Sequence, residues 1–425
     1  MRIPTQLLVL PLLILYPERA ALTAQIQLAH AATRAQADSD PVSVRWNRLV
    51  PKLVDENAAR RRAARSAATA AHDSLALRRV AMTPPPILFR VYTLLSVAQY
   101  GAVNSARDNR AVSADVAVAA ASAAVLTQLF TDSAVRATIA GELARDIDHA
   151  RSRSRGAELA IAGRSLGEDV AARVIAWSPP LLSFAAPWKG TIPTGPGMWY
   201  SAPGIPPIGI LMAQARPWLL DSASQLRSAP PPAYGSPTFQ TALEEVRQIS
   251  RNRTSEQTKV AQKWNSVDPW APWNETASAA IRRHHLSDAD AARVLAVLNA
   301  ASSDAVIACF EAKYHYWSIR PSQADTSIVL ADSVDLPNFP SYPSGHACSA
   351  GAFDAVLGHF FPQDRAEFTR IAEEQAMSRL YGGIHYRFDD DEGLRLGRAV
   401  ARYDVERERR GGLNAWRSAR VEHKP

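Results

Sequence analysis

The sequence of 425 residues has only two cysteines, Cys309 and Cys348. Two thiols cannot form the disulfide framework of a small secreted domain. They are either a bonded pair in an oxidising compartment or two small buried side chains. The sequence also lacks a convincing stretch in which apolar and polar residues alternate, the pattern that a half-buried strand requires. A fold dominated by β-sheet is therefore not expected.

Long apolar runs are also missing. The most apolar internal segment, residues 116–126, is much shorter than the roughly 20 residues of a transmembrane helix. The N-terminal apolar run, residues 7–16, follows Arg2 and precedes small-x-small sequences, which is the pattern of an export signal. The alternative, a membrane anchor, would be too short to cross a bilayer. We expect residues 1–37 to be an export signal, the mature chain to have no membrane span, and the protein to be periplasmic or extracellular.

The sequence has no stripe of basic residues interleaved with aromatics, although its net charge is +7. A nucleic-acid interface would need such a stripe. The basic runs at residues 60–62 and 407–410 look like polar helix faces. We therefore expect no nucleic-acid partner and expect the excess positive charge to attract an anion at a site. The sequence leaves the oligomeric state open, a homo-oligomer included.

Helical patterns dominate what is present. We predict helices after prolines 84–86 and near residues 113–130, 133–147 and 156–177. Ser287, with Asp290 three residues later, is typical of the start of a helix, and its apolar face continues to Ala312. Later helices are predicted near residues 347–361, 365–380 and 392–407.

The segment between Pro179 and Pro237 differs, because it contains thirteen prolines. Regular helix is excluded over most of it. Its three tryptophans indicate that it packs on the folded body rather than forming a solvated linker. We predict an all-α fold of two helical bundles, residues 38–178 and 238–425, joined by this Pro-rich wrapping segment, residues 179–237, with the active site in the C-terminal bundle.

The first of three motifs is KYHYWSIRP, residues 313–321. Lys313 and Arg320 lie seven residues apart, so on one helix both cations would leave the same face about 10 Å apart. Pro321 disfavours helical geometry at Arg320 and would place its guanidinium at a helix end. Such a pair usually lies on a solvated face. Here the preceding face is apolar, so both charges would point inward, where cations need an anion.

The second motif is PSGH, residues 343–346. Pro343 sets a turn, Ser344 is placed to cap the following helix, and Gly345 lets a ligand approach the backbone closely. The unpaired amides at that helix start favour an anion, and His346 would lie beside it in the first turn. The alternative is a plain helix cap with a surface histidine.

The third motif is SRLYGGIHYRFD, which starts at residue 378. Arg379 ends one helix, glycines 382–383 break it, and His385 follows. Asp389, four residues after His385, can hold one ring nitrogen and fix the tautomer, which leaves the other nitrogen as a nucleophile or metal ligand. Residues 390–392 are expected to be first-turn acids that complement a helix dipole.

Together these motifs resemble the signature of the superfamily that unites type 2 phosphatidic acid phosphatases, bacterial non-specific acid phosphatases and vanadium-dependent haloperoxidases. That signature is Lys-x6-Arg-Pro, then Pro-Ser-Gly-His, then Ser-Arg-x5-His-x3-Asp. Every fixed position is present within residues 313–389. The sequence is most similar to the bacterial haloperoxidase-like proteins of this superfamily.

The resemblance implies a role for each motif residue. A phosphate or vanadate oxyanion would be held by five residues: Lys313, Arg320, Ser344, Gly345 and Arg379. His385 would be the nucleophile of a phosphatase or the apical vanadium ligand of a haloperoxidase. His346 would be the general acid/base, and Asp389 would orient His385.

The resemblance implies one of two enzymes. A haloperoxidase would use vanadate as cofactor and hydrogen peroxide and halide as substrates. A soluble exported acid phosphatase would need no cofactor and would hydrolyse phosphate monoesters through a phosphohistidine. The missing membrane spans, the long helical half before the site and the stretch LLSVAQYGAVNSA favour the haloperoxidase. Phe339, at a position where bromoperoxidases carry histidine, resembles the chloroperoxidases. A site that binds an oxyanion without turnover is the third alternative.

Overall fold

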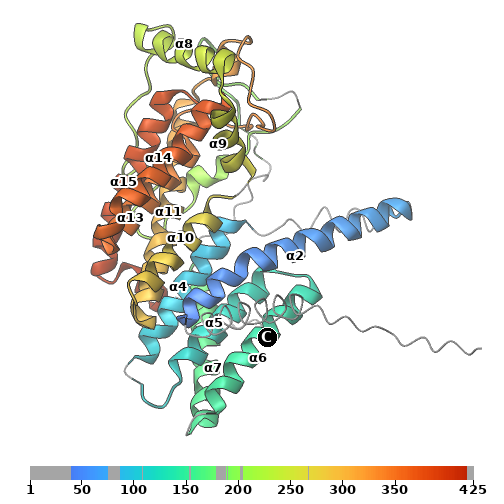
Figure 1. Ribbon diagram of the computed structural model, residues 1–425, viewed down its shortest axis with the longest axis vertical. Helices are drawn as coiled ribbons and strands as arrows, with labels where there is room; N and C mark the ends of the chain where they lie inside the picture. The colour runs from blue at the N-terminus through green and yellow to red at the C-terminus, as the bar shows by residue number, and fades with distance from the viewer. Residues whose placement is uncertain are drawn as a thin grey trace, which may run out of the picture. The chain divides into compact units, whose positions relative to one another are not determined.

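The computed structural model describes residues 40–74, 87–107, 109–152, 155–178, 188, 190–201, 204–266 and 268–418 (Figure 1). The expected export signal, residues 1–37, lies outside these residues, as does part of the Pro-rich segment. Among the described residues there is no β-strand, and the isolated bridge found there pairs Met198 with Ser318. The prediction of an all-α protein is confirmed.

The helices described before the Pro-rich segment are α2 (Val42–Ala70), α4 (Leu88–Ala106), α5 (Ala114–Leu129), α6 (Ser133–Arg151) and α7 (Gly156–Trp177). Two of these helices, α5 and α6, start at a capping side chain. The Ser113 side chain accepts the N–H of Val116 at the start of α5, and the Asp132 carboxylate accepts two N–H groups at the start of α6. Such caps satisfy amides that have no partner within the helix.

The C-terminal part is built around α11 (Asp288–Tyr316), which the Ser287 side chain caps through the N–H of Asp290. Among the described helices, α11 is the one long and apolar enough to cross a membrane. However, 94% of its apolar 18-residue stretch is buried inside the protein. It packs against α4 and also against α13 (Gly345–Phe360) and α15 (Arg387–Arg409). This burial is that of a core helix.

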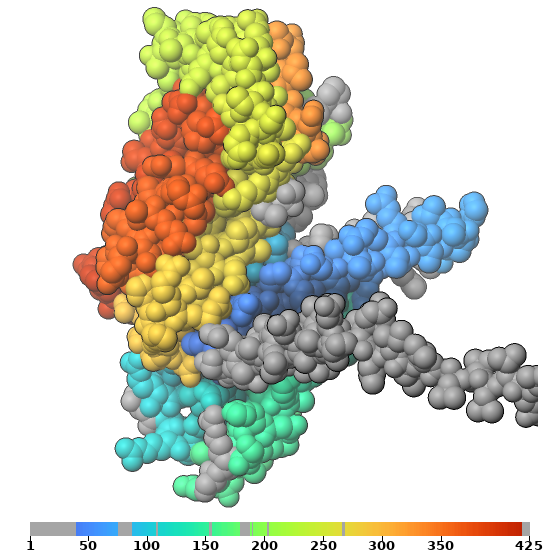
Figure 2. Space-filling model, viewed as in Figure 1, coloured from blue at the N-terminus to red at the C-terminus, as the bar shows by residue number. Residues whose placement is uncertain are grey.

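The other helices of the C-terminal part are α8 (Pro237–Asn252), α9 (Ser255–Ser266), α10 (Trp270–Arg283), the short α12 (Pro321–Ala324) and α14 (Arg365–Gly382). Helix α14 packs against α13 and α9. In Figure 2 the orange-red surface of the C-terminal helices lies directly against the yellow-green surface near α9. Helix α14 thus connects α9 to the pair α13 and α15, and these two pack directly against α11.

Two glycines let α13 and α15 approach closely. A Cβ atom at Gly397 would lie 2.0 Å from the carbonyl oxygen of Cys348, and one at Gly351 would lie 2.4 Å from that of Leu394. Both contacts are with backbone, so any larger residue would push the helices apart. The close packing brings the N-terminal ends of both helices together, and those ends carry the second and third motifs.

Parts of the Pro-rich segment are bonded to α11 and the loop after it. The N–H of Trp199 donates to the carbonyl of Trp317. The N–H groups of Trp218, Leu219 and Leu220 donate to the fully buried carboxylate of Asp304, at 2.7, 2.7 and 3.0 Å. Burial raises the pKa of Asp304 to about 6, although these three N–H groups act to lower it. The proposed domain boundaries stay a prediction.

Candidate active site

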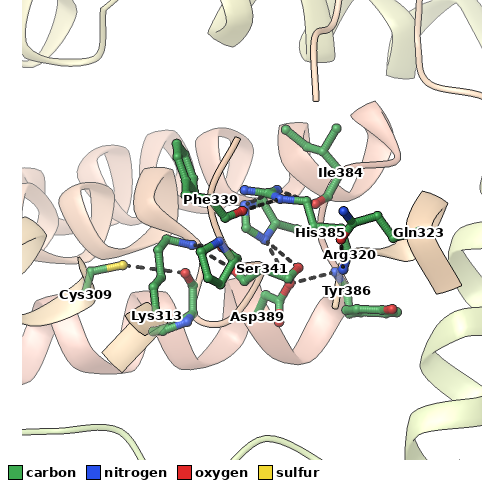
Figure 3. Close-up of polar contacts among 12 residues, drawn as sticks. Cys309, Lys313, Arg320, Gln323, Phe339, Ser341, Ile384, His385, Tyr386 and Asp389 are labelled. Carbon is green, nitrogen blue, oxygen red and sulfur yellow. Dashed lines mark hydrogen bonds and ion pairs between the residues drawn. The ribbon is translucent and has the colours of Figure 1, made fainter. Parts of the chain in front are cut away.

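Three segments that are far apart in the sequence meet where α13 and α15 begin (Figure 3). They are residues 313–320, residues 339–346 and residues 379–389, the three motifs together with the turn before the second one. Lys313, Arg320 and Arg379 are all at most 2% exposed, and His385 is 3% exposed. The structure therefore buries three cations and an imidazole in one region.

Lys313 and Arg320 do not share a helix, so the expectation of one helical face is wrong. Helix α11 ends at Tyr316, because Trp317 adopts the left-handed conformation with a φ of 51°. Arg320 is instead the N-cap residue of α12, in an extended conformation that the following Pro321 favours. The two cations converge because the chain turns back after α11.

Lys313 reaches the turn before the second motif. Its ammonium group donates to the carbonyl oxygens of Pro340 and Ser341 at 3.0 and 2.7 Å. Burial lowers the pKa of Lys313 to about 8. The ammonium is therefore still mostly protonated at neutral pH, and its charge is not neutralised by a direct carboxylate partner in these contacts.

Arg320 is held by two carbonyl groups and retains one unused nitrogen. Its Nε donates to Phe339 O at 2.9 Å and its Nη1 to Ile384 O at 2.7 Å, whereas Nη2 has no partner. The ring of Phe339 lies 5.0 Å from Arg320 Cζ and 5.1 Å from Lys313 Nζ. Phe339 is therefore the aromatic wall that both cations face.

The geometry around His385 defines its tautomer. Nδ1 lies 2.8 Å from Asp389 Oδ2, and this oxygen also accepts from the Ser341 hydroxyl at 2.5 Å and from the Tyr386 N–H at 3.2 Å. Nε2 lies 3.3 Å from Arg320 Nη1. Because a guanidinium only donates, Nε2 must offer its lone pair, and the proton must be on Nδ1. Nε2 is thus the reactive nitrogen.

The electrostatic surroundings keep His385 neutral. Burial lowers the pKa of His385 well below its ordinary value, and Arg320 and Lys313 add to this shift. Burial also raises the pKa of Asp389 to about 6, with the Ser341 hydroxyl opposing the rise. At neutral pH the pair is therefore an imidazole beside a carboxylate, as a nucleophile or ligand at Nε2 requires.

Residues 344–346 line this region at the start of α13, where Ser344 is fully buried and Gly345 and His346 are partly buried. Ser344 is the N-cap of α13, but its side chain makes no capping bond, and its buried Oγ has no partner. A Cβ atom at Gly345 would meet no atom closer than Lys313 Cε, at 4.0 Å. There is therefore room for an added group at Gly345, and two buried donors of this region, Ser344 Oγ and Arg320 Nη2, have no hydrogen-bond partner. A ligand that accepts hydrogen bonds fits there.

His346 and Arg379 approach from α13 and α14. His346 Nε2 lies 3.2 Å from the carbonyl oxygen of Trp264, so Nε2 carries a proton. Burial lowers the pKa of His346 well below its usual range, and Arg379 adds to the effect. Arg379 donates to neutral acceptors, including the carbonyl of Ala261 at 3.0 Å. Burial lowers its pKa to about 10, so it stays charged at neutral pH.

The donor set favours an anion rather than a metal cation. Within the described ranges, no group of three or more histidine, cysteine or acidic side chains is arranged to hold a metal ion. Cys309 and Cys348 are free and buried, so they match the second sequence interpretation, two small buried side chains. Three cations, two unused donors and one free imidazole nitrogen instead fit a tetrahedral or five-coordinate oxyanion.

Ser341 and the backbone carbonyls around Arg320 were not identified from the sequence. Ser341 Oγ donates to Asp389 and lies 3.4 Å from His385 Nδ1. It lies only three residues before Ser344, but no general spacing rule connects a serine in a turn to an acid that follows 48 positions later. Only the folded turn shows that Ser341 supports the imidazole.

Comparison with known proteins identifies the family to which this site belongs. Residues 292–405 match the PAP2 superfamily. The chain therefore contains a PAP2 superfamily domain, and the resemblance seen in the three motifs is confirmed. The matched residues include both imidazoles and all three buried cations.

Two curated relatives match shorter segments. A vanadium-dependent bromoperoxidase of Ascophyllum nodosum is 33% identical over 93 residues, which cover 15% of this chain and 17% of that protein. A lipid A 1-phosphatase of Rhizobium etli is 41% identical over 59 residues, which cover 14% of this chain and 25% of that protein. The chain thus spans a quarter or less of these relatives, one from each branch of the superfamily.

Solved structures match over most of the chain. A bacterial vanadium-dependent iodoperoxidase has a TM-score of 0.65 and 24% identity, covering 76% of this chain and 91% of that one. The apo form of a bacterial vanadium-dependent chloroperoxidase has a TM-score of 0.60 and 12% identity, covering 77% and 95%. At these identities the likeness establishes a shared fold.

Proposed function

We propose that this protein is a vanadate-dependent haloperoxidase-like enzyme that oxidises halide with hydrogen peroxide. The observation that carries the proposal is the His385 ring, whose Nδ1 is held by Asp389 and whose unprotonated Nε2 lies among three buried cations. The likeness of fold to bacterial iodo- and chloroperoxidases over three quarters of the chain supports this branch of the superfamily.

The residues present fit vanadate as a cofactor. Nε2 of His385 would bind the vanadium, and the oxygens would be held by the charged and polar donors of the site: Lys313, Arg320, Arg379, Ser344 and the amide of Gly345. Each charge-assisted hydrogen bond would contribute about 1.5–3 kcal/mol. When bound, vanadate would supply the Lewis-acid chemistry that activates peroxide for halide oxidation.

The protein's own groups would manage the proton. His346 donates from Nε2 to Trp264, so in its neutral form Nδ1 is the nitrogen that can accept a proton. Its lowered pKa makes it a proton acceptor rather than a donor before substrate binds. We therefore assign to His346 the role of a general base that removes a proton from peroxide and later returns it.

Burial of the site supports small substrates. His385 is 3% exposed and Arg320 is completely buried, whereas Gly345 and His346 are only partly buried. Access would therefore come from the start of α13. Peroxide and halide would need little movement to enter, whereas a bulky ester would need more. Export to the periplasm or outside the cell belongs to the same proposal, on the strength of the N-terminal pattern.

A phosphatase is the second candidate, and the match to a lipid A 1-phosphatase favours it. In that reaction Nε2 of His385 would attack phosphorus and form a phosphohistidine as the alcohol leaves with a proton from His346. Water would then hydrolyse the phosphohistidine. The same donors would stabilise the five-coordinate transition state.

One experiment separates the two activities. The purified full-length protein receives vanadate, hydrogen peroxide and iodide, bromide or chloride with a halogenation dye, and in parallel a chromogenic phosphate ester without vanadate. The haloperoxidase proposal expects vanadate-dependent dye halogenation. Ester hydrolysis without any halogenation would replace the haloperoxidase proposal with the phosphatase. If neither product forms, the site binds an oxyanion without turnover.

Asp389 provides a graded prediction within this function. In Asp389→Asn, the amide oxygen would take the Oδ2 position, because the Ser341 hydroxyl and the Tyr386 N–H both donate there. The tautomer of His385 would survive but its basicity would fall. We expect halogenation to decrease about 10-fold in Asp389→Asn and about 100-fold in Asp389→Ala. Steady-state rates of the two variants check this, and equal losses would show that Asp389 does not act by orienting the ring.

A further inference from the structure

The Pro-rich segment encloses a cavity to which the proposed function gives no role. The cavity has a volume of about 750 Å³ and is lined by described residues between Ile192 and Pro206. This volume lies within the range of about 300–1,000 Å³ that is usual for small-molecule sites. Among the described residues that line it, no side chain is charged. The cavity therefore suits a neutral organic molecule better than a halide or a phosphate.

The walls of the cavity expose large apolar side chains. Met198, Tyr200 and Ile205 are 36, 55 and 51% exposed, and they are three of the seven large hydrophobic side chains exposed in the described part of the chain. Apolar side chains gathered around a concavity usually mark a ligand site or an interface. A protein interface uses about 20–30 residues on each side, far more than this cavity offers. A flat aromatic molecule fits these walls better.

The cavity wall is bonded to the segment that carries Arg320. Met198 pairs with Ser318 in an antiparallel bridge, and two backbone hydrogen bonds of 2.7 and 2.9 Å flank this bridge. Segments paired in this way lie about 4.8 Å apart. The carbonyl of Ser318 in turn accepts the N–H of Ser341, whose hydroxyl donates to Asp389. A single extended segment thus joins the cavity wall to the anion site.

Two side-chain amides connect the cavity to the same site. Gln323 donates to the carbonyl of Tyr200 at 2.7 Å and accepts the N–H of Arg320 at 3.2 Å. Asn338 donates to a hydroxyl and a carbonyl of two other cavity residues, at 2.8 and 2.9 Å. It directly precedes Phe339, the aromatic wall that faces the buried cations. The cavity is therefore held in a fixed position beside the anion site.

We propose that this cavity binds the organic molecule that accepts the halogen, a neutral aromatic such as a phenol or a naphthol. This inference rests on the proposed function, because the anion site has to produce hypohalous acid. There, halide, hydrogen peroxide and one proton give hypohalous acid and water. Hypohalous acid then converts an aromatic C–H bond into a carbon–halogen bond, and the displaced ring proton leaves with the hydroxide as water. An aromatic molecule in the cavity would meet the hypohalous acid close to where it forms.

The first test measures binding of 1-naphthol to the full-length protein by calorimetry, without vanadate or peroxide. Ile205→Asp places a carboxylate in the apolar wall and should weaken binding by about 10-fold or more. Ile161→Asp is the matched control and should bind as the wild type does, because Ile161 is 67% exposed on α7 and is not part of the cavity lining. Equal affinities of the wild type and Ile205→Asp, or an equal loss in both variants, overturn the inference. Tyr200→Ala provides the same comparison if Ile205→Asp does not fold.

The second test shows whether the bound aromatic is the one that is halogenated. With vanadate, peroxide and iodide, triiodide formation measures halide oxidation without an organic acceptor, and iodonaphthol formation measures halogen transfer. At low naphthol, the ratio of iodonaphthol to triiodide should fall about 10-fold in Ile205→Asp and stay unchanged in Ile161→Asp. A ratio that Ile205→Asp leaves unchanged places the transfer in bulk solution and overturns the acceptor role. A wild type that binds naphthol but forms no triiodide contradicts the proposed function and leaves the cavity as a binding site alone.

Discussion

His385→Ala is expected to lose halogenation activity by a factor on the order of 10⁴ or more, to the background of the vanadate solution. Nε2 of His385 carries the lone pair of the ring that Asp389 orients, and it lies among the buried cations, 3.3 Å from Arg320 Nη1. Without it, vanadium has no protein ligand, and the anion is held by hydrogen bonds alone. The phosphatase alternative predicts an equal loss of ester hydrolysis, because its nucleophile is the same atom.

The control for this prediction is the folded state of the variant. His385 contacts Asp389, Ser341 and Arg320, and its removal leaves Asp389 with the Ser341 and Tyr386 donors. We therefore expect the far-ultraviolet circular dichroism to be unchanged and the melting temperature to shift modestly. A folded His385→Ala protein with more than a few per cent of wild-type activity would remove the apical assignment.

His346→Gln is expected to lower kcat/KM by about 10²–10⁴-fold, the usual range for removal of a general acid or base. Glutamine can still donate to the carbonyl of Trp264, the partner of His346 Nε2, but it cannot accept a proton. The contact between Gln375 and the backbone carbonyl of His346 is also unaffected by this substitution. The loss should therefore come from proton transfer and not from disruption of α13.

Anion binding separates these two roles. Calorimetry with molybdate should give His346→Gln an affinity within a few-fold of the wild type, because Lys313, Arg320 and Arg379 remain in place. A variant that keeps wild-type turnover would show that another group moves the proton. A variant that loses binding and turnover together would make His346 a residue that holds the anion.

The sequence predicted the chemistry of the site better than its geometry. Spacing alone placed Asp389 within reach of His385, because four residues across a helix start bring side chains together, and the observed distance is 2.8 Å. Spacing was misleading for Lys313 and Arg320, because the helix was assumed to continue to Arg320. A left-handed residue at Trp317 has no unique sequence signal.

Other features depend on long-range packing that no local pattern encodes. Phe339 faces both cations only because the turn before α13 folds back over the end of α11. Ser344 looked like a capping side chain, yet its buried hydroxyl makes no capping bond to α13. Asp390 lies in the first turn of α15, as the sequence predicts, but no local pattern shows that it is buried there. In the same helix, a Cβ atom at Gly393 would lie 2.7 Å from Ser344 O, so α13 packs closely against this end of α15.

The central claim is that the three motifs converge on one oxyanion, and a crystal structure of the protein soaked with orthovanadate tests it most directly. The account predicts one vanadium atom bonded to Nε2 of His385, with its oxygens within hydrogen-bond distance of Lys313, Arg320 and Arg379. Vanadate bound elsewhere, or a fully soaked crystal in which Nε2 of His385 contacts no vanadium, would contradict it.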